Sequence, residues 1–146
     1  MVVALLLGVL LGAEREYHGH PAGLRTMGLI SAGACMFTAI GLDPSFGTRT
    51  DPTRIAAQVV TGVGFIGAGA ILRQGVDIKG LTTAASIWVA AAVGVSVGVG
   101  LYEAAVFTTF LVIVTLIAIR PLEVRLFHRH KDRQPDEPTS SQQPTS

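Results

Sequence analysis

Four charged side chains stand close together in an otherwise apolar part of the chain, and they are the first candidates for chemistry. Glu14, Arg15 and Glu16 follow one apolar run, and Arg25 opens the next. On a helix, Glu14 and Glu16 lie roughly 200° apart, so at most one of them faces inward. Two interpretations stay open. One is an interfacial cluster of solvated charges, and the other is an inward-facing glutamate that pairs with Arg25, since embedded ion pairs are costly to keep without a role.

A second polar group shares one helix face, because Asp51, Arg54 and Gln58 are spaced three and four residues apart. Asp51 is typical of a helix cap and Arg54 of an anchor at the lipid headgroups. Gln58 lies one turn deeper, so we expect it to find a partner inside the bundle. His18 and His20 stand beside the glutamates, but loop histidines near an interface are usually solvated, and the pattern assigns no metal ligand.

Glycines recur in the apolar run after this group. Gly62, Gly64 and Gly67 spell the dinucleotide pattern G-x-G-x-x-G, with Gly69 two residues further on. We reject nucleotide binding because no strand precedes the motif, and Thr82 stands where an acidic residue is required. Close packing against another helix, with Gly64 and Gly69 on the contact surface, is the favoured interpretation. A broken helix that exposes carbonyls to a ligand is the alternative.

Little else in the chain indicates chemistry. Trp88 lies about two turns into an apolar run, so core packing is expected and lining a pocket is the alternative. No Ser–His–acid set, paired catalytic carboxylates or cysteine nucleophile appears, so enzyme activity has no support and no cofactor is assigned. The formal net charge of +1, without a dense basic face, argues against nucleic-acid binding.

Five apolar runs must position these residues. They are Met1–Ala13, Ala22–Ile40, Ile55–Leu72, Leu81–Gly100 and Leu101–Ile119. Charged residues make up 14% of the chain, against about a quarter in soluble domains. Runs two to five come close to the roughly 20 residues that a membrane span requires. The sequence therefore predicts an all-α, polytopic membrane helix bundle of about five transmembrane helices in a lipid bilayer.

The first run is too short for a typical span. Three explanations are open: a signal peptide, a short helix that thins the bilayer, or a first helix clipped at Met1. A signal peptide lacks support because no basic region precedes the run and Glu14 follows it directly. We favour the clipped helix.

Several residues mark the expected boundaries. Asp51 and Pro52 place a cap and a proline at the start of the third helix. The hydroxyls of Thr82 and Thr83 are expected to cap the fourth helix. Arg120-Pro121 is expected to close the fifth. We therefore predict a transmembrane domain over residues 1–126 and a disordered polar tail over residues 127–146.

Basic residues predict the orientation in the membrane. With five spans, nine of the 11 lie on the side that holds the C-terminus: Arg15, Arg25, Arg73, Lys79, Arg120, Arg125, Arg129, Lys131 and Arg133. The positive-inside rule places that side in the cytoplasm and the N-terminus outside.

Taken in order, these motifs resemble the membrane domain of the MgtC/SapB family. The blocks that carry the resemblance are Gly12-x-Glu14-Arg15-Glu16, Ala22-Gly23-Leu24-Arg25-Thr26, Asp51 to Gly69, Gly80-Leu81-Thr82-Thr83-Ala84-Ala85-x-x-Trp88 and Arg120-Pro121-Leu122-Glu123. The resemblance covers about residues 5 to 125. Many members of the family carry a folded cytoplasmic C-terminal domain, whereas this chain has only a polar segment there.

The resemblance implies a bacterial inner-membrane protein associated with growth at low magnesium and with survival inside macrophages. The family is labelled as magnesium transporters, and a better-known member acts on the F-type ATP synthase. Two hypotheses follow. The first is a regulator that contacts another membrane complex, such as the ATP synthase. The second is a Mg²⁺ transporter or channel, which usually needs several oxygen ligands. The few carboxylates, scattered over both membrane faces, favour the regulator. Separately, the chain is a candidate homo-oligomer.

Overall fold

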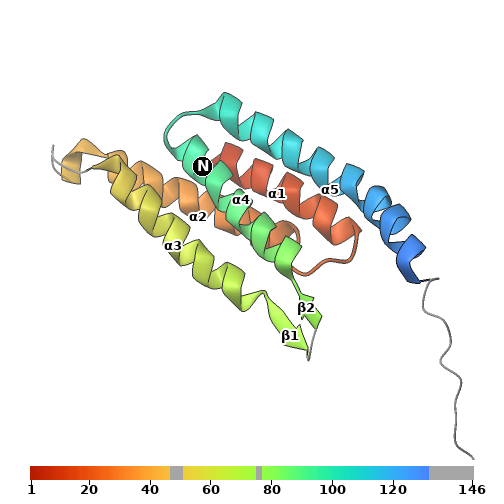
Figure 1. The fold of residues 1–146 in the computed structure, drawn as a ribbon. Coiled ribbons are helices and arrows are strands. Elements are labelled where there is room, and N and C mark those ends of the chain that lie inside the picture. The colour runs from red at the N-terminus through yellow and green to blue at the C-terminus, as the bar shows by residue number, and fades with distance from the viewer. Residues whose placement is uncertain (47–50, 75–76, 132–146) are drawn as a thin grey trace, which may run out of the picture. The chain divides into compact units, whose positions relative to one another are not determined.

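The computed structural model describes residues 1–46, 51–74 and 77–131 of the 146-residue chain (Figure 1). Five α-helices form most of it: α1 (Val2–Tyr17), α2 (Leu24–Leu42), α3 (Pro52–Gly69), α4 (Leu81–Gly98) and α5 (Tyr102–Lys131). A 3-10 turn, η1 (Pro44–Phe46), follows α2, and an antiparallel hairpin of β1 (Leu72–Gln74) and β2 (Asp77–Lys79) joins α3 to α4. The predicted all-α fold is confirmed. The third apolar run was predicted to extend to Leu72. The helix ends at Gly69, and Leu72 pairs with Lys79 in the hairpin.

Within the described residues, three helices are long and apolar enough to cross a membrane: α2, α4 and Tyr102–Ile119 of α5. Helix α1 is short, as predicted, although its 16 residues run past Ala13 through the charged triplet. At a rise of about 1.5 Å per residue, it reaches about 24 Å. Helix α3 has 18 residues, and Arg54 and Gln58 make it less apolar than α2 or α4. The chain is thus a membrane protein built as a helix bundle.

Two predicted helix starts have different outcomes. Asp51 caps α3 as expected, since its Oδ1 accepts a hydrogen bond from the Thr53 backbone N–H at 2.9 Å, and Pro52 opens the helix. The predicted hydroxyl cap of α4 is wrong. Gly80 is its N-cap, with a positive φ of 91° that favours glycine, and no side chain caps the helix. The Thr83 hydroxyl accepts a hydrogen bond from the Arg15 side chain and does not cap the helix.

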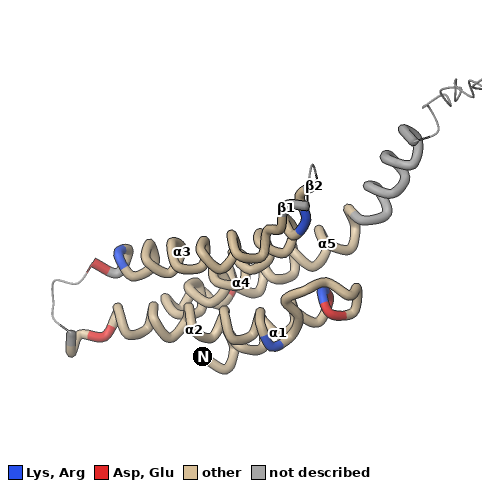
Figure 2. The backbone as a smooth tube through the Cα atoms, turned by 90° about the horizontal axis from the view of Figure 1, so that it is seen from below, with Lys and Arg blue, Asp and Glu red and all other residues tan. Residues whose placement is uncertain are grey.

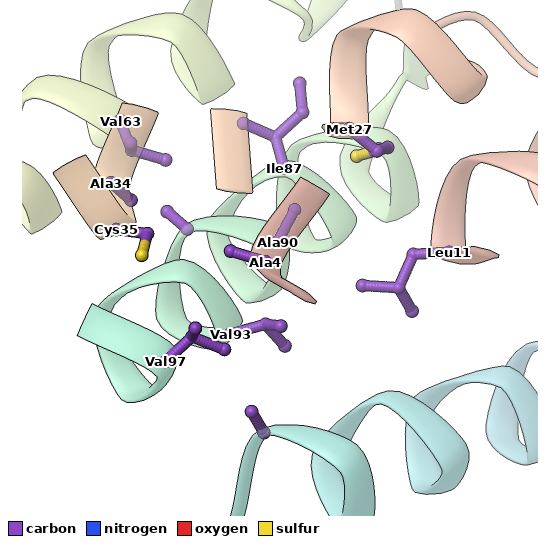
Figure 3. Packing of buried hydrophobic residues seen from close by; sticks show 12 residues of the cluster. Ala4, Leu11, Met27, Ala34, Cys35, Val63, Ile87, Ala90, Val93 and Val97 are labelled. Atoms are coloured by element: carbon purple, nitrogen blue, oxygen red, sulfur yellow. The ribbon is translucent and has the colours of Figure 1, made fainter. Parts of the chain in front are cut away.

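Helices α2 and α4 pack against each other in the middle of residues 1–113, with α1 and α3 on either side of this pair (Figure 1). Helix α1 contacts both α2 and α4, and so does α3. The buried core between them is made mostly of small apolar side chains, and Figure 3 shows Ala4, Ala34, Ala90, Val93 and Val97 together with the larger Leu11, Met27 and Ile87. Charged residues lie mainly at the helix ends (Figure 2).

Glycines allow this close packing, but they are not the glycines that the sequence analysis selected. A Cβ added at Gly94 of α4 would collide with the Ser31 carbonyl of α2. One added at Gly12 of α1 would lie 2.6 Å from the Gly23 carbonyl oxygen. The backbones of α1, α2 and α4 therefore approach closely only because side chains are missing there.

The glycines of α3 mostly face away from the other helices of this chain. A Cβ at Gly62, Gly64 or Gly69 would have nothing within 4 Å, and one at Gly67 would make ordinary contact with Ala84. The predicted packing through Gly64 and Gly69 is therefore wrong for contacts within the chain, because the inward stripe of α3 passes through other positions. The alternative of a broken helix is also wrong, since α3 is continuous from Pro52 to Gly69.

Two further predictions need correction. Trp88 is 50% exposed on α4 and lies outside the core, since the inward face of α4 is taken by smaller residues. Helix α5 continues past Arg120-Pro121 as far as Lys131, because a proline removes one helical hydrogen bond without ending the turns that follow. Residues 127–131 of the predicted tail are thus helical. The chain divides into compact units of residues 1–113 and 114–146, and the rest of the tail, 132–146, lies outside the described residues.

Candidate functional site

Arg15 is the most deeply buried charged residue among those the structure describes, with a relative exposure of 1%. It lies in the last turn of α1. The buried residues of that helix are Ala4, Gly8, Leu11, Gly12 and Arg15, which follow helical spacing along one stripe. Arg15 is the end of this inward stripe, so Glu14 and Glu16 point to either side of it. The expectation that one of the two glutamates faces inward is therefore corrected, because Arg15 between them is the buried residue.

Hydroxyl groups of α4 hold the Arg15 guanidinium. One terminal nitrogen donates a hydrogen bond to Ser86 Oγ at 2.8 Å, and the other donates to Thr83 Oγ1 at 2.6 Å. The second nitrogen also lies 3.4 Å from the Pro21 carbonyl in the α1–α2 loop. Ser86 Oγ in turn donates to the Thr82 carbonyl at 2.8 Å. Arg15 therefore connects α1, the following loop and the first turns of α4.

The two glutamates have local partners. Glu16 Oε2 accepts a hydrogen bond from the Leu24 backbone N–H at 3.0 Å, at the start of α2 where negative charge is favoured. Glu14 Oε1 lies 2.9 Å from His18 Nδ1. Arg25 is exposed and forms no ion pair with any described residue. Of the two interpretations left open, the pair between Arg25 and a glutamate is therefore wrong, because both carboxylates are engaged within α1 or at the α2 start.

No carboxylate among the described residues forms a salt bridge with the buried Arg15, which is an unusual environment for a cation. Its Nε has no hydrogen-bond partner among the residues described. Glu14, next to it in sequence, acts on its charge only through space. Burying a charge that is not fully compensated is costly, more so in a bundle surrounded by lipid. The hydroxyls of Thr83 and Ser86 supply dipoles and no counter-charge.

His18 and His20 do not assemble a metal site in the described part of the chain, where no group of three histidine, cysteine or acidic side chains could hold an ion. His18 Nδ1 also lies 2.9 Å from the Glu14 backbone carbonyl. His20 Nδ1 is buried and has no partner there. This local arrangement gives no basis for assigning a metal.

At the opposite end of the bundle, the Asp51 group is exposed. The Thr53 hydroxyl and its backbone N–H donate to the Asp51 carboxylate, which lowers the pKa of that carboxyl below its ordinary value. Arg54 is exposed, as expected of an anchor. Gln58 is also exposed and has no hydrogen-bond partner among the described side chains, so its expected partner in the bundle is absent. It faces outward because the inward stripe of α3 passes through Val59 and Val63.

Gln58 instead lines a groove on the outer surface between α2 and α3. The groove has a volume of about 580 Å³. Apolar side chains make up its walls, and the residues that line it are Leu29, Ile30, Gly33, Ala34, Phe37, Ile55, Gln58, Val59, Gly62, Val63 and Ile66. Gly33 on α2 and Gly62 on α3 each have open space where a side chain would stand. We call this surface the α2–α3 groove.

Sequence reasoning missed two parts of these sites. Ser86 received no role, although its spacing of three residues from Thr83 puts both hydroxyls on one face of α4. The α2–α3 groove depends on how two helices diverge, and no local pattern indicates that. Gln58 was selected for a partner inside the bundle and Gly62 as part of the glycine-rich segment, and neither was assigned to an outer groove.

The fold and these sites define a helical membrane protein with a buried arginine and an apolar external groove. The chain belongs to the MgtC family, whose model matches residues 1–125. It is 40% identical over 126 residues to Protein MgtC of Salmonella typhimurium, covering 86% of this chain and 53% of that protein. It is 44% identical over 119 residues to Protein MgtC of Brucella abortus, covering 82% and 49%.

An uncharacterized protein of Synechocystis sp. is 43% identical over 129 residues, which cover 88% of this chain and 54% of that protein. The chain therefore spans about half the length of the curated relatives that it matches. No solved structure matches it significantly.

Proposed function

We propose that this chain is a multi-pass protein of the bacterial inner membrane that regulates another membrane complex by direct contact, in the context of magnesium limitation. The family resemblance makes the F-type ATP synthase the first partner to test. Arg15, Arg25 and Lys79 lie at the bundle end formed by the α1–α2 loop and the hairpin, which the positive-inside rule assigns to the cytoplasm. The N-terminus is then outside and the C-terminus inside.

The α2–α3 groove is the observation that carries this proposal. Its open glycines, Gly33 and Gly62, permit the close backbone approach typical of packed transmembrane helices. The Gln58 amide can both donate and accept hydrogen bonds, and lipid tails offer no partner for it. A transmembrane helix of the partner complex, with a polar side chain opposite Gln58, satisfies both features.

The charges support contact rather than cation conduction. Among the residues whose side chains the structure describes, the buried charged group is the Arg15 guanidinium, which repels a divalent cation. Glu14 lies beside His18 and Glu16 caps α2, while Asp51 caps α3, so these carboxylates have local tasks. A Mg²⁺ path would need several oxygen ligands at one place.

Filling the groove tests the proposal. We expect Gly62→Leu to reduce growth at low magnesium and control of cytosolic ATP to the level of cells without the protein, because a leucine occupies the space that the partner helix needs. Gly64→Leu is the matched control: it makes the same change two residues away, also with open space, but does not line the groove.

Both variants should reach the membrane at normal levels, since a leucine in a helix is more favourable than glycine by up to about 1 kcal/mol. Equal activity of the two variants would contradict the proposal. So would Mg²⁺ flux into proteoliposomes that contain only the purified protein, because a regulator acting by contact carries none.

A further inference from the structure

We infer that the α2–α3 groove also receives α5 of a second copy of this chain, and that this contact between copies competes with the partner complex. The inference names a form of regulation for the groove, and its regulatory part rests on the proposed function. The occupant is the outward side of Tyr102–Ile113, the part of α5 that belongs to the same compact unit as α2 and α3.

The outward side of α5 carries large apolar side chains and one carboxylate. Ala105 and Thr109 are buried, so they mark the side of α5 that packs on the rest of its unit. Phe107 and Phe110 are each 65% exposed, and Glu103 lies one turn before Phe107. Helical spacing puts Glu103, Phe107 and Phe110 on the side opposite Ala105. We call these three residues the α5 ridge.

The α5 ridge and the rim of the groove carry opposite charges. Arg54 is exposed in the first turn of α3, one turn before Gln58 and on the same side of the helix. Glu103 is exposed in the first turn of α5. Neither side chain forms a salt bridge with a residue that the structure describes. The Asp51 carboxylate acts on Arg54 only through space, and it is held by hydrogen bonds from Thr53.

The two charges lie at matching depth in neighbouring copies. Successive helices reverse direction, so α3 and α5 run the same way and begin at the same membrane surface. Two copies inserted in one orientation therefore present α3 and α5 to each other as parallel helices. The contact is heterologous, since each copy offers its ridge and receives another on its groove.

With the charges level, the ridge also fits the shape of the groove. Gly62 lies eight residues after Arg54, and Phe110 lies seven residues after Glu103. At a rise of about 1.5 Å per residue, Phe110 comes within about 1.5 Å of the depth of Gly62. Gly62 and Gly33 leave open space there, which the phenylalanine ring occupies. Such packing of a large side chain over small ones drives helix association in lipid.

Gln58 makes the second copy a weaker occupant than the proposed partner. Gln58 lies four residues after Arg54, so the level ridge residue is Phe107, four residues after Glu103. A phenylalanine ring offers the amide no conventional hydrogen bond. A partner helix with a polar side chain at this depth satisfies the amide and displaces α5. Self-association therefore covers the groove until the partner is present.

Cysteine crosslinking of the purified full chain in liposomes tests the contact between copies without any partner. Two differently tagged populations are mixed in a Cys35→Ala background, one with Gly62→Cys and the other with Phe110→Cys. We expect a disulfide-linked pair that carries both tags. The matched control pairs Gly64→Cys with Phe110→Cys and should give none, because position 64 does not line the groove.

Energy transfer between labelled copies in the same liposomes tests the charge pair. Glu103→Arg should weaken self-association about fivefold or more, since it turns an attraction between exposed charges into a repulsion. Adding Arg54→Glu to the same chain should restore it, which also shows that the single variant was folded. Arg25→Glu, an exposed charge reversal at the opposite end of the bundle, should change self-association less than about twofold.

The competition is tested in cells by photo-crosslinking from position 62 to the partner complex. Glu103→Arg should increase that adduct at least about twofold, because it frees the groove. An unchanged adduct would overturn the competition. Equal disulfide yields from positions 62 and 64, no disulfide at all, or a loss in Glu103→Arg that Arg54→Glu does not restore would overturn the contact between copies. The disulfide in liposomes together with no adduct to another complex in cells would support that contact and contradict the proposed function instead.

Discussion

The hydrogen bond between Arg15 and Thr83 allows a quantitative test of how α1 is held to α4. Thr83→Val removes the hydroxyl that lies 2.6 Å from one guanidinium nitrogen and keeps the shape of the side chain. That nitrogen is then left with the Pro21 carbonyl at 3.4 Å. A hydrogen bond to a charged group contributes about 1.5–3 kcal/mol. We therefore expect the free energy of unfolding to fall by about 2 kcal/mol.

The double-mutant cycle with Arg15→Met isolates this contact. Methionine fills much of the same volume without a charge, so its own effect combines lost hydrogen bonds with relief of the cost of burying a cation. In that background the Thr83 hydroxyl has no donor to accept from, and Thr83→Val should cost close to nothing. The expected coupling energy is about 2 kcal/mol, within the range for residues in direct contact.

Equilibrium unfolding in mixed micelles, followed by the fluorescence of the single tryptophan, measures these energies. The matched control is Thr82→Val, which changes the neighbouring, exposed threonine whose hydroxyl does not contact Arg15. It should shift stability by no more than about 0.5 kcal/mol. Equal losses from Thr83→Val with and without Arg15 would refute the contact.

Two further predictions concern packing and capping. Gly94→Ala should destabilise the bundle by about 1–3 kcal/mol, since its Cβ collides with the Ser31 carbonyl, whereas Gly64→Ala should stabilise α3 slightly; unfolding midpoints check both. The lowered pKa of Asp51 means that its charged form stabilises the fold above the ordinary carboxyl pKa, and that this stabilisation is lost as pH falls through the lowered value. Asp51→Asn should therefore show a weaker loss of thermal stability on acidification.

The number and order of the helices could be predicted from the sequence, because apolar runs of this length have few alternatives in a membrane. The Asp51 cap could also be predicted, since capping is a local property. The inward direction of Arg15 is different. It depends on the rotation of α1 about its own axis. That rotation is set by the close contact of Gly8 and Gly12 with α2, which is a tertiary interaction. The spacing of Ala4, Gly8 and Gly12 was the available signal.

The glycines of α3 also show that a local sequence pattern does not determine a tertiary contact. A glycine-rich helix indicates that something approaches closely, but not what approaches. In α3 the space at Gly62 opens onto the outer surface, whereas the close contacts within the chain form at Gly12 and Gly94. Gln58 was expected to lie inside the bundle because lipid offers its amide no hydrogen-bond partner. Its outward position is the reason to propose a partner from another protein.

The most direct test of the proposed contact is site-specific photo-crosslinking in living cells, with a photoreactive amino acid at position 62 or, as control, at position 64. We predict that position 62 gives an adduct with a membrane subunit of the ATP synthase, that Gly33→Leu abolishes it by filling the groove from the opposite wall, and that position 64 gives none. An adduct at 62 with only lipid or a second copy of the chain, or equal adducts at both positions, would contradict the account.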